Sequence, residues 1–302
     1  MCLMTTLCLL AAGLGAGVGA GVGVAVAAPA QAEAPAGAHV SVRLAPGLSA
    51  SEHSALARAG AFGARPLRLL IVGDSIAMTL GMGLSVASQP DYGVSVIDDA
   101  TVGCDLDPQM GVVTEGTPGP ATQGCDNWRA LWPFLVAAEH PQVVALGLGR
   151  WEVADHFENG QWVHIGEPAW DEHLTQDLED AIAIFHTFGA KVVLLTMPYV
   201  DPSDRAPDGS PWPENSPART QAYNALVRQV AQSDPADVSV LDLNHMLNPD
   251  GVYSGTLDGV DTRSSDGIHV SVAGGELLQR QILPAIGRIG MEDETTAAKA
   301  RA

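Results

Sequence analysis

Basic side chains are scarce in this sequence. It has 15 Lys and Arg residues against 35 Asp and Glu, which gives a formal net charge of -20 at pH 7. A chain of this charge repels phosphate groups, so binding to nucleic acids or to anionic membrane surfaces is disfavoured. Aromatic residues make up 5% of the chain and no internal repeat is evident, whereas hydrophobic residues reach 46%. Over 302 residues this composition favours one large domain with an ample core.

Cysteine is scarce as well, with four residues in the chain. Cys2 and Cys8 lie in the N-terminal leader, which leaves Cys104 and Cys125 in the remainder. In an exported protein such a pair favours a disulfide, and the alternative is two reduced thiols. The pair has no histidine neighbours at ligand spacing, and neither a glycine-rich phosphate loop nor a carboxylate cluster is visible in the sequence. We therefore expect no metal and no cofactor.

Charge is absent from residues 1–32, and an uninterrupted apolar stretch runs from Leu7 to Ala28. A stretch of this length is typical of an export signal or a membrane anchor. It is rich in glycine, has no flanking Lys or Arg, and is followed by small-residue cleavage options around Ala30. We favour a cleaved signal, with an uncleaved anchor as the alternative. Both predict a secreted or extracytoplasmic protein, in the second case anchored by this segment.

The rest of the chain divides by composition. Residues 33–65 are rich in Ala, Pro, Gly and Ser and predict a flexible linker. We expect the folded domain at residues 66–290 and a disordered tail at 291–302. Within the domain, the expected strands are 69–72, 94–97, 143–148, 192–195 and 238–243. The expected helices lie near 75–87, 126–139, 170–187, 217–232 and 271–287.

The regular alternation of strands and helices predicts an α/β three-layer sandwich with a five-stranded parallel sheet. Continuous Val and Leu runs such as 192–195 are typical of strands that are covered on both faces. Ligands of such sheets bind beyond the carboxyl ends of the strands. We therefore expect Ser75, Gly103 and residues 149–151, each of which follows a strand, to meet at one edge of the sheet.

Two short motifs carry the chemistry. A Gly-Asp-Ser sequence ending at Ser75 directly follows the apolar run 69–72. A serine on a glycine-led turn from a buried strand into a helix can present its hydroxyl and its backbone N–H to a substrate. Asp266 and His269 stand three positions apart, so one turn lets the carboxylate orient the imidazole, and the three groups together can activate a hydroxyl for acyl transfer. Each motif alone is also typical of a structural feature, a helix cap or a turn.

With these motifs the chain resembles the SGNH (GDSL-like) hydrolase superfamily, whose first block is the Gly-Asp-Ser turn and whose last is Asp-x-x-His. The resemblance extends over residues 66–288. Residues 147–153, 209–213 and 241–244 look more closely like the extracytoplasmic SGNH domains attached to membrane O-acyltransferases. The resemblance implies a flavodoxin-like SGNH fold, modification of cell-surface polysaccharides, and a small acyl group such as acetyl.

One block departs from the superfamily pattern. The third block usually reads Gly-x-Asn-Asp, with the asparagine donating to the oxyanion, but here Gly149 is followed by Arg-Trp-Glu. The resemblance then leaves the oxyanion to the N–H groups of Ser75 and Gly103, with Arg150 as a further donor. Loss of one donor can cost about a hundredfold in rate, so slow hydrolysis, a different donor and transfer all stay open. Arg150 as a surface ion-pair partner and Trp151 as a core residue are the structural alternatives.

We expect Ser75, Asp266 and His269 to form the catalytic triad of an extracytoplasmic serine esterase or O-acyltransferase. Its substrate would be a small acyl ester of a carbohydrate, and a membrane acyltransferase is a possible partner. The alternative from another class is a catalytically weak or inactive SGNH-fold binding domain at the cell surface. Trp162 and Trp212, in two long loops, suit contact with sugar rings but are also typical loop anchors.

Overall fold

The computed structural model describes residues 66–120 and 122–300. These fall within one compact unit, Val40–Ala302. The expected leader at 1–32 and the expected linker at 33–65 lie outside the described residues.

Five parallel strands form the central sheet, in the order β2-β1-β5-β8-β9. The strands are β1 (Leu67–Gly73), β2 (Val94–Asp98), β5 (Val143–Gly147), β8 (Lys191–Leu195) and β9 (Val238–Leu241). The four residues from Leu69 to Val72 are 0% exposed. Both faces of such a strand are covered, which is why an uninterrupted apolar run forms it. The α/β class and the five-stranded parallel sheet predicted from the sequence are confirmed.

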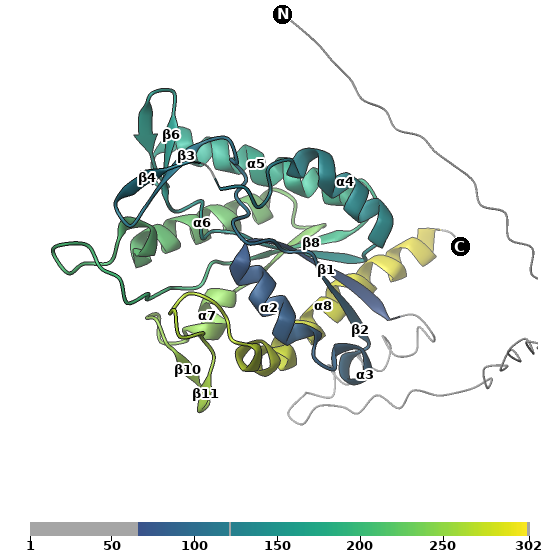
Figure 1. The fold of residues 1–302 in the computed structure, drawn as a ribbon. Helices are drawn as coiled ribbons and strands as arrows, with labels where there is room; N and C mark the ends of the chain where they lie inside the picture. Colours follow the sequence, from purple (N-terminus) through teal and green to yellow (C-terminus); the bar gives the residue numbers. More distant parts are fainter. Residues whose placement is uncertain (1–65, 121, 301–302) are drawn as a thin grey trace, which may run out of the picture. The chain divides into compact units, whose positions relative to one another are not determined.

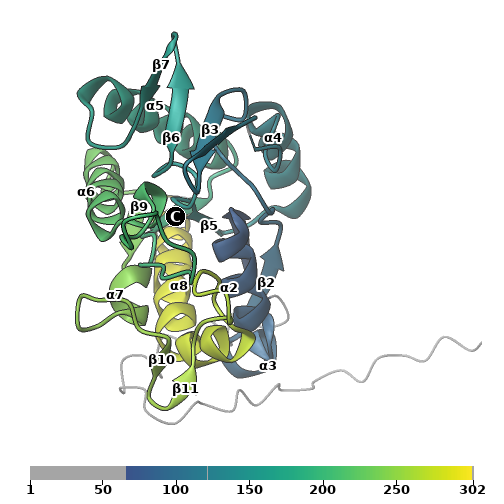
Figure 2. The same cartoon turned by 60° about the vertical axis from the view of Figure 1, so that its left-hand side comes forward.

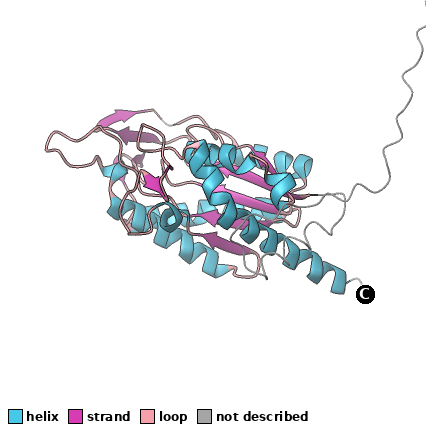
Figure 3. Cartoon of the chain, turned by 90° about the horizontal axis from the view of Figure 1, so that it is seen from below, coloured by secondary structure: helices cyan, strands magenta, loops and turns pink. Residues whose placement is uncertain are grey.

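Helices cover both faces of this sheet (Figure 1, Figure 3). On one face lie α2 (Ser75–Ser85), α3 (Ser88–Tyr92) and α8 (Val272–Ala300). On the other lie α4 (Trp128–Glu139), α5 (Pro168–His186) and α6 (Pro217–Ser233). The chain runs from β1 to β2 on one side and then to β5 on the other, so the direction of winding reverses at β1. Ligand sites of open α/β sheets lie at this kind of switch point.

The helices α2 and α8 pack backbone against backbone. A Cβ atom added to Gly83 of α2 would lie 2.5 Å from the Cα atom of Gly275 in α8. The buried Gln279 side chain donates from α8 to the carbonyl of Gly83 at 2.9 Å. This contact holds the beginning of α8 beside α2, although the two helices lie far apart in the sequence.

Several smaller elements lie outside the three layers of the sandwich. A four-stranded antiparallel sheet, in the order β4-β3-β6-β7, joins the loop after β2 to the loop after β5 and is seen at the top of Figure 2. Its strands are β3 (Gly111–Thr114), β4 (Thr117–Gly119), β6 (Asp155–Glu158) and β7 (Gln161–Val163). The remaining pieces are η1 (Pro213–Asn215), α7 (Leu243–Leu247), β10 (Thr256–Leu257) and β11 (Val260–Asp261). None was predicted, because runs this short carry too little periodicity for a sequence pattern to emerge.

The last helix is longer than expected. Helix α8 continues to Ala300, so residues 291–300 are helical and the expectation of a disordered tail over 291–302 is corrected for them. Glu, Ala and Lys in this stretch are strong helix formers and extend the packed helix beyond the domain. Within residues 66–120 and 122–300, no helix is both long and apolar enough to span a membrane.

Candidate active site

Ser75 is the first residue of α2, directly after the turn that ends β1. The turn requires glycine: Gly73 has φ +131°, and a Cβ atom there would lie 1.8 Å from the carbonyl oxygen of Gly147. Asp74 caps the helix, and its Oδ1 accepts the N–H of Ile76 at 2.8 Å. The serine is therefore held at the carboxyl end of β1, at the positive end of a helix dipole.

Besides capping α2, Asp74 joins this helix to the segment that follows β5. It is buried, and its second oxygen accepts the backbone N–H of Arg150 at 3.1 Å. Burial raises the pKa of the Asp74 carboxyl, and the N–H donors of Arg150, Ile76 and Ala77 oppose that rise. This carboxyl therefore ties the beginning of α2 to the segment that follows β5.

His269 bridges the other two members of the expected triad. Its Nδ1 lies 2.6 Å from Oδ2 of Asp266, and its Nε2 lies 2.9 Å from Oγ of Ser75. Oδ1 of Asp266 also accepts the backbone N–H groups of Ile268 and His269 at 2.8 and 3.0 Å. Partial burial raises the pKa of Asp266, but hydrogen bonds from His269 and these two N–H groups outweigh it, and the net pKa is lowered. The carboxylate is therefore ionised at neutral pH and stabilises the Nδ1–H tautomer, which leaves Nε2 to accept a proton from Ser75.

The loop that carries Asp266 and His269, called the histidine loop below, is anchored by Arg263, a residue that the sequence analysis missed. Arg263 is 6% exposed and donates to the carbonyls of Ile268 at 3.1 Å and Tyr199 at 2.7 Å. Burial lowers the pKa of Arg263 to about 10, a value at which the guanidinium still carries its charge at neutral pH. Only its position in the fold, between the 197–216 loop and the histidine loop, indicates this role.

Among the described residues, the backbone N–H groups of the two expected oxyanion donors, Ser75 and Gly103, have no hydrogen-bond acceptor. That of Ser75 has no intrahelical acceptor because it opens the helix. That of Gly103 has no acceptor among the described residues. The Gly103 turn is held at the end of β1, since the N–H of Thr101 donates to the carbonyl of Gly73 at 2.8 Å.

The side chain of Arg150 is directed to a neighbouring loop. Its Nη1 donates to the carbonyl of Glu214 at 3.3 Å, and its guanidinium lies 5.9 Å from the ring centre of Trp151. Burial lowers the pKa of Arg150, and the negative charges of Glu214, Asp74 and Glu115 oppose that effect. Arg150 is therefore placed as a cation beside Asp74, with no hydrogen bond to any residue of the candidate triad among the described residues.

Glu152 occupies the last position of the altered third block. It is 0% exposed, and its Oε2 accepts the N–H of Gly149 at 2.7 Å. Its Oε1 is buried without a hydrogen-bond partner among the described residues. Burial, with the nearby charges of Asp105 and Asp74, raises the pKa of this carboxyl well above its usual range. A protonated Glu152 therefore shapes the loop beneath Arg150.

Cys104 and Cys125 form a disulfide in the structure. The bond closes the loop that begins beside Gly103. Asp105, the residue after Cys104, accepts a hydrogen bond from Nε2 of the buried His156 at 3.1 Å. The ring of Trp170 stacks on this histidine, with 4.6 Å between the ring centres. His156 is therefore a core residue.

The loop aromatics make ordinary protein contacts. Trp212 donates to Asp204 at 2.6 Å. Trp162, which is 40% exposed, packs on Phe157 at 5.0 Å. The structure therefore adds nothing to the sugar-contact hypothesis for them.

The order of the strands, with Ser75 after β1 and Asp266 and His269 before the last helix, gives a three-layer α/β arrangement around a parallel sheet, with these three residues at one edge of it. A family model described as protein of unknown function (DUF459) matches residues 68–285, and the chain belongs to this family. No curated protein matches the sequence.

Three solved structures illustrate the likeness in fold. An alpha/beta hydrolase from the metagenome of Lake Arreo is 18% identical, with 76% of this chain and 98% of that one covered, at a TM-score of 0.47. A GDSL-like lipase from Bacteroides thetaiotaomicron is 14% identical, with coverage of 78% and 97% and a TM-score of 0.47. A variant of an acetyl xylan esterase from Geobacillus stearothermophilus is 18% identical, with coverage of 74% and 95% and a TM-score of 0.45.

Proposed function

We propose that this protein is an extracytoplasmic serine esterase or O-acyltransferase that acts on small acyl esters, such as acetyl esters of carbohydrates. The observation that carries the proposal is the continuous relay from Asp266 through His269 to Ser75, with contacts of 2.6 and 2.9 Å. A serine, an imidazole and an ionised carboxylate in this order are the groups that acyl transfer requires.

The geometry supports a two-step reaction. Nε2 of His269 takes the hydroxyl proton as Oγ of Ser75 attacks the ester carbonyl carbon. The N–H groups of Ser75 and Gly103 hold the oxyanion, and the same Nε2–H then protonates the leaving alcohol as the acyl-enzyme forms. In the second step Nε2 of His269 deprotonates the acceptor, which attacks the acyl carbon, and the resulting Nε2–H returns the proton to Oγ of Ser75 as the bond from Oγ to the acyl carbon breaks. Water as the acceptor gives an esterase, and a sugar hydroxyl gives an O-acyltransferase.

Solvent reaches the relay from the histidine side. The side chains of His269 and Asp266 are 29% and 44% exposed, whereas Ser75 is 6% exposed. An acceptor larger than water can approach the imidazole along this side without a rearrangement of the core. The exposure also weakens the ion pair, since solvent screens such pairs.

The proposed location rests on the apolar N-terminal segment and on the disulfide between Cys104 and Cys125, because disulfides persist mainly outside the cytoplasm. Residues 147–153 resemble SGNH domains that are attached to membrane O-acyltransferases. On this resemblance the proposal includes a membrane acyltransferase that delivers the acyl group.

Hydrolysis of p-nitrophenyl acetate by the purified protein tests the chemistry. Ser75→Ala and His269→Ala should each lower kcat by at least about a thousandfold, because each removes a member of a cooperating unit. Ser85→Ala, an exposed serine on the same helix, is the matched control and should keep full activity. Arg150→Ala should lower the rate only partly if the oxyanion is shared. Unchanged turnover in Ser75→Ala contradicts the mechanism.

A weak or inactive binding domain is the competing function, and the absence of an asparagine in the third block favours it. Labelling by a fluorophosphonate separates the two, because only an activated serine reacts with the probe. Labelling that needs Ser75 and His269 supports an enzyme, even where water is a poor acceptor. Inert Ser75 in the folded protein supports the binding domain.

A further inference from the structure

A second cluster of titratable side chains lies outside the candidate active site. It is formed by Asp107, three residues after Cys104, and by His173 and Asp177, one turn apart on α5. Nε2 of His173 lies 2.6 Å from Oδ1 of Asp107 and 3.7 Å from Oδ2 of Asp177. One candidate ligand atom from each residue lies within 4.8 Å of the other two. Two carboxylates and an imidazole thus converge from a loop and a helix.

Both carboxylates of this cluster carry an unsatisfied oxygen. Oδ2 of Asp107 and Oδ2 of Asp177 are buried without a hydrogen-bond partner among the described residues. The side chains are 7% and 5% exposed. A buried charged oxygen without a partner is costly, and a bound ion is one of its standard explanations. The two oxygens therefore point to a missing positive ligand.

The neighbouring cation leaves these oxygens available. The guanidinium of Arg129 pairs with Oδ1 of Asp177 and with Asp180, and it lies 4.1 Å from the ring centre of Trp128. Its contact with Asp177 uses the other carboxylate oxygen. The charge of Arg129 therefore offsets only part of the negative charge of the cluster.

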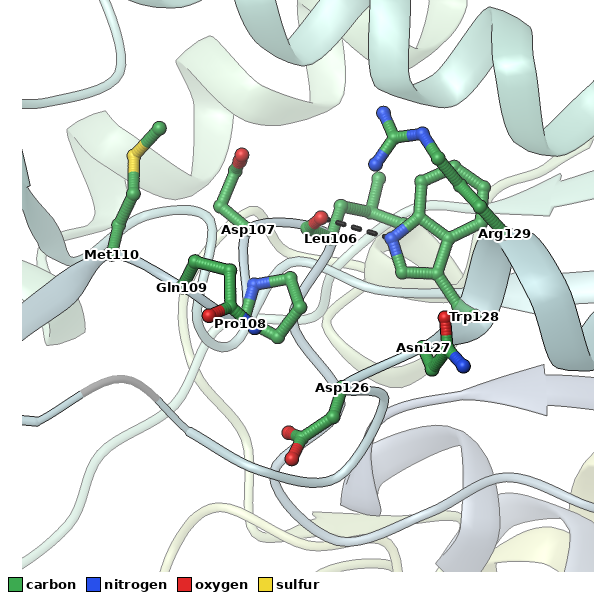
Figure 4. A pocket seen from close by; sticks show the side chains of 9 residues that line it. All are labelled: Leu106, Asp107, Pro108, Gln109, Met110, Asp126, Asn127, Trp128 and Arg129. Carbon is green, nitrogen blue, oxygen red and sulfur yellow. Dashed lines mark hydrogen bonds between the residues drawn. The ribbon is translucent and has the colours of Figure 1, made fainter.

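A hollow lies beside one member of the cluster, Asp107. It has a volume of about 210 Å³, and both Asp107 and Arg129 stand on its wall (Figure 4). Leu106 and Trp128 form part of the same wall, and the indole N–H of Trp128 donates to the carbonyl of Leu106 at 2.9 Å. Water and small ions can reach Asp107 through this hollow.

We propose that Asp107, His173 and Asp177 form a binding site for a divalent cation of the zinc class. Zinc accepts both imidazole nitrogen and carboxylate oxygen, whereas magnesium and calcium prefer sites made only of oxygen. Tetrahedral bonds of about 2.1 Å place neighbouring ligand atoms about 3.4 Å apart, so small rotations of these side chains suffice. On binding, Nε2 of His173 gives its proton to solvent and coordinates the ion, and water from the hollow completes the shell.

The site has a structural consequence for the proposed function. Asp107 lies four residues after Gly103, within the loop closed by the disulfide. A cation held by Asp107 and the two α5 residues fastens this loop to α5. The ion stabilises the segment that carries an oxyanion donor and takes no part in the reaction of Ser75.

A second acidic cluster, of His186, Asp234 and Asp237, is a weaker candidate. Its aspartates are 44% and 45% exposed, and Lys191 already pairs with Asp237. It supplies a control for binding to surface carboxylates.

Calorimetric titration of the metal-stripped, untagged full chain with ZnCl2 tests the proposal. The wild type should bind one equivalent and gain several degrees in Tm at saturation, since a ligand of the folded state stabilises it by mass action. His173→Gln should weaken binding at least thirtyfold and lose the Tm gain. Glu179→Gln, which removes an exposed charge from the same helix, and His186→Gln should bind as the wild type does.

X-ray absorption of the zinc-loaded wild type provides a measurement that needs no variant. One imidazole with oxygen ligands and no sulfur supports the site, and sulfur ligands from the leader cysteines overturn it. The proposal also fails if the wild type binds no zinc, if His173→Gln binds as tightly, or if His186→Gln removes binding. None of these outcomes bears on the esterase proposal, which is tested through Ser75.

Discussion

Replacement of Glu152 by glutamine should change how the free energy of unfolding depends on pH. Burial, reinforced by the charges of Asp105 and Asp74, raises the pKa of Glu152 well above the 4.5 of an ordinary glutamate. The folded protein therefore keeps a proton on this carboxyl at pH values where the unfolded chain releases it. Glutamine has nearly the same shape, stays neutral, and can still accept the N–H of Gly149.

The sign of the effect follows from proton linkage. The contribution of the protonated Glu152 to stability is complete below pH 4.5 and is lost as the pH rises towards the raised pKa of the folded state. Within that window the loss is about 1.4 kcal/mol per pH unit. Glu152→Gln has no such loss, so its stability relative to the wild type should increase by about 1 kcal/mol between pH 5 and pH 6.

Urea unfolding followed by tryptophan fluorescence at pH 5, 6 and 7 measures the difference, provided that the m-values agree. All other titrating groups are shared, so they cancel between the two proteins to first order. Glu276→Gln, an exposed glutamate on α8, is the control and should run parallel to the wild type. A Glu152→Gln difference that stays constant or falls with pH refutes the reasoning, because Glu152 is then ionised in the folded protein.

Two further predictions concern the supports of the site. Arg263→Ala removes two of the hydrogen bonds that hold the loop carrying His269 and should slow p-nitrophenyl acetate hydrolysis at least about tenfold at temperatures where the variant is folded by circular dichroism; an unchanged rate means that the loop does not depend on this anchor. Cys104→Ser with Cys125→Ser should lower the free energy of unfolding by about 3 kcal/mol in the chain-entropy account, given a sequence separation of 21 residues; a loss below about 1 kcal/mol in urea unfolding contradicts that account.

Much of the sandwich could be predicted from local pattern. The five core strands and the larger helices begin within a few residues of their expected limits, and all but α8 also end there, because each buries a long apolar run or stripe. The sheet of β3, β4, β6 and β7 escaped prediction because its strands are short and only partly buried. Residues 291–302 were expected to form a disordered tail, yet α8 runs to Ala300.

The candidate site also contains some residues that the sequence predicts and others that it does not. Ser75, Asp266 and His269 could be named because each lies in a short motif whose chemistry is local. The supporting residues could not: Arg263 and Glu152 have no motif, and their roles depend on burial. Arg150 was expected as a surface ion pair or an oxyanion donor, and its contact with the Glu214 carbonyl arises from a loop 64 positions away.

The sequence by itself determined the class of fold, the three side chains of the candidate triad and the cysteine pair, because these depend on periodicity and on neighbours within a few positions. Tertiary structure decided the 2.9 Å contact between groups 194 positions apart and the protonation of Glu152. It also decided the meeting of Asp107 with His173 across 66 positions. Distances and dielectric surroundings of this kind arise only when helices and loops pack, and no local pattern encodes them.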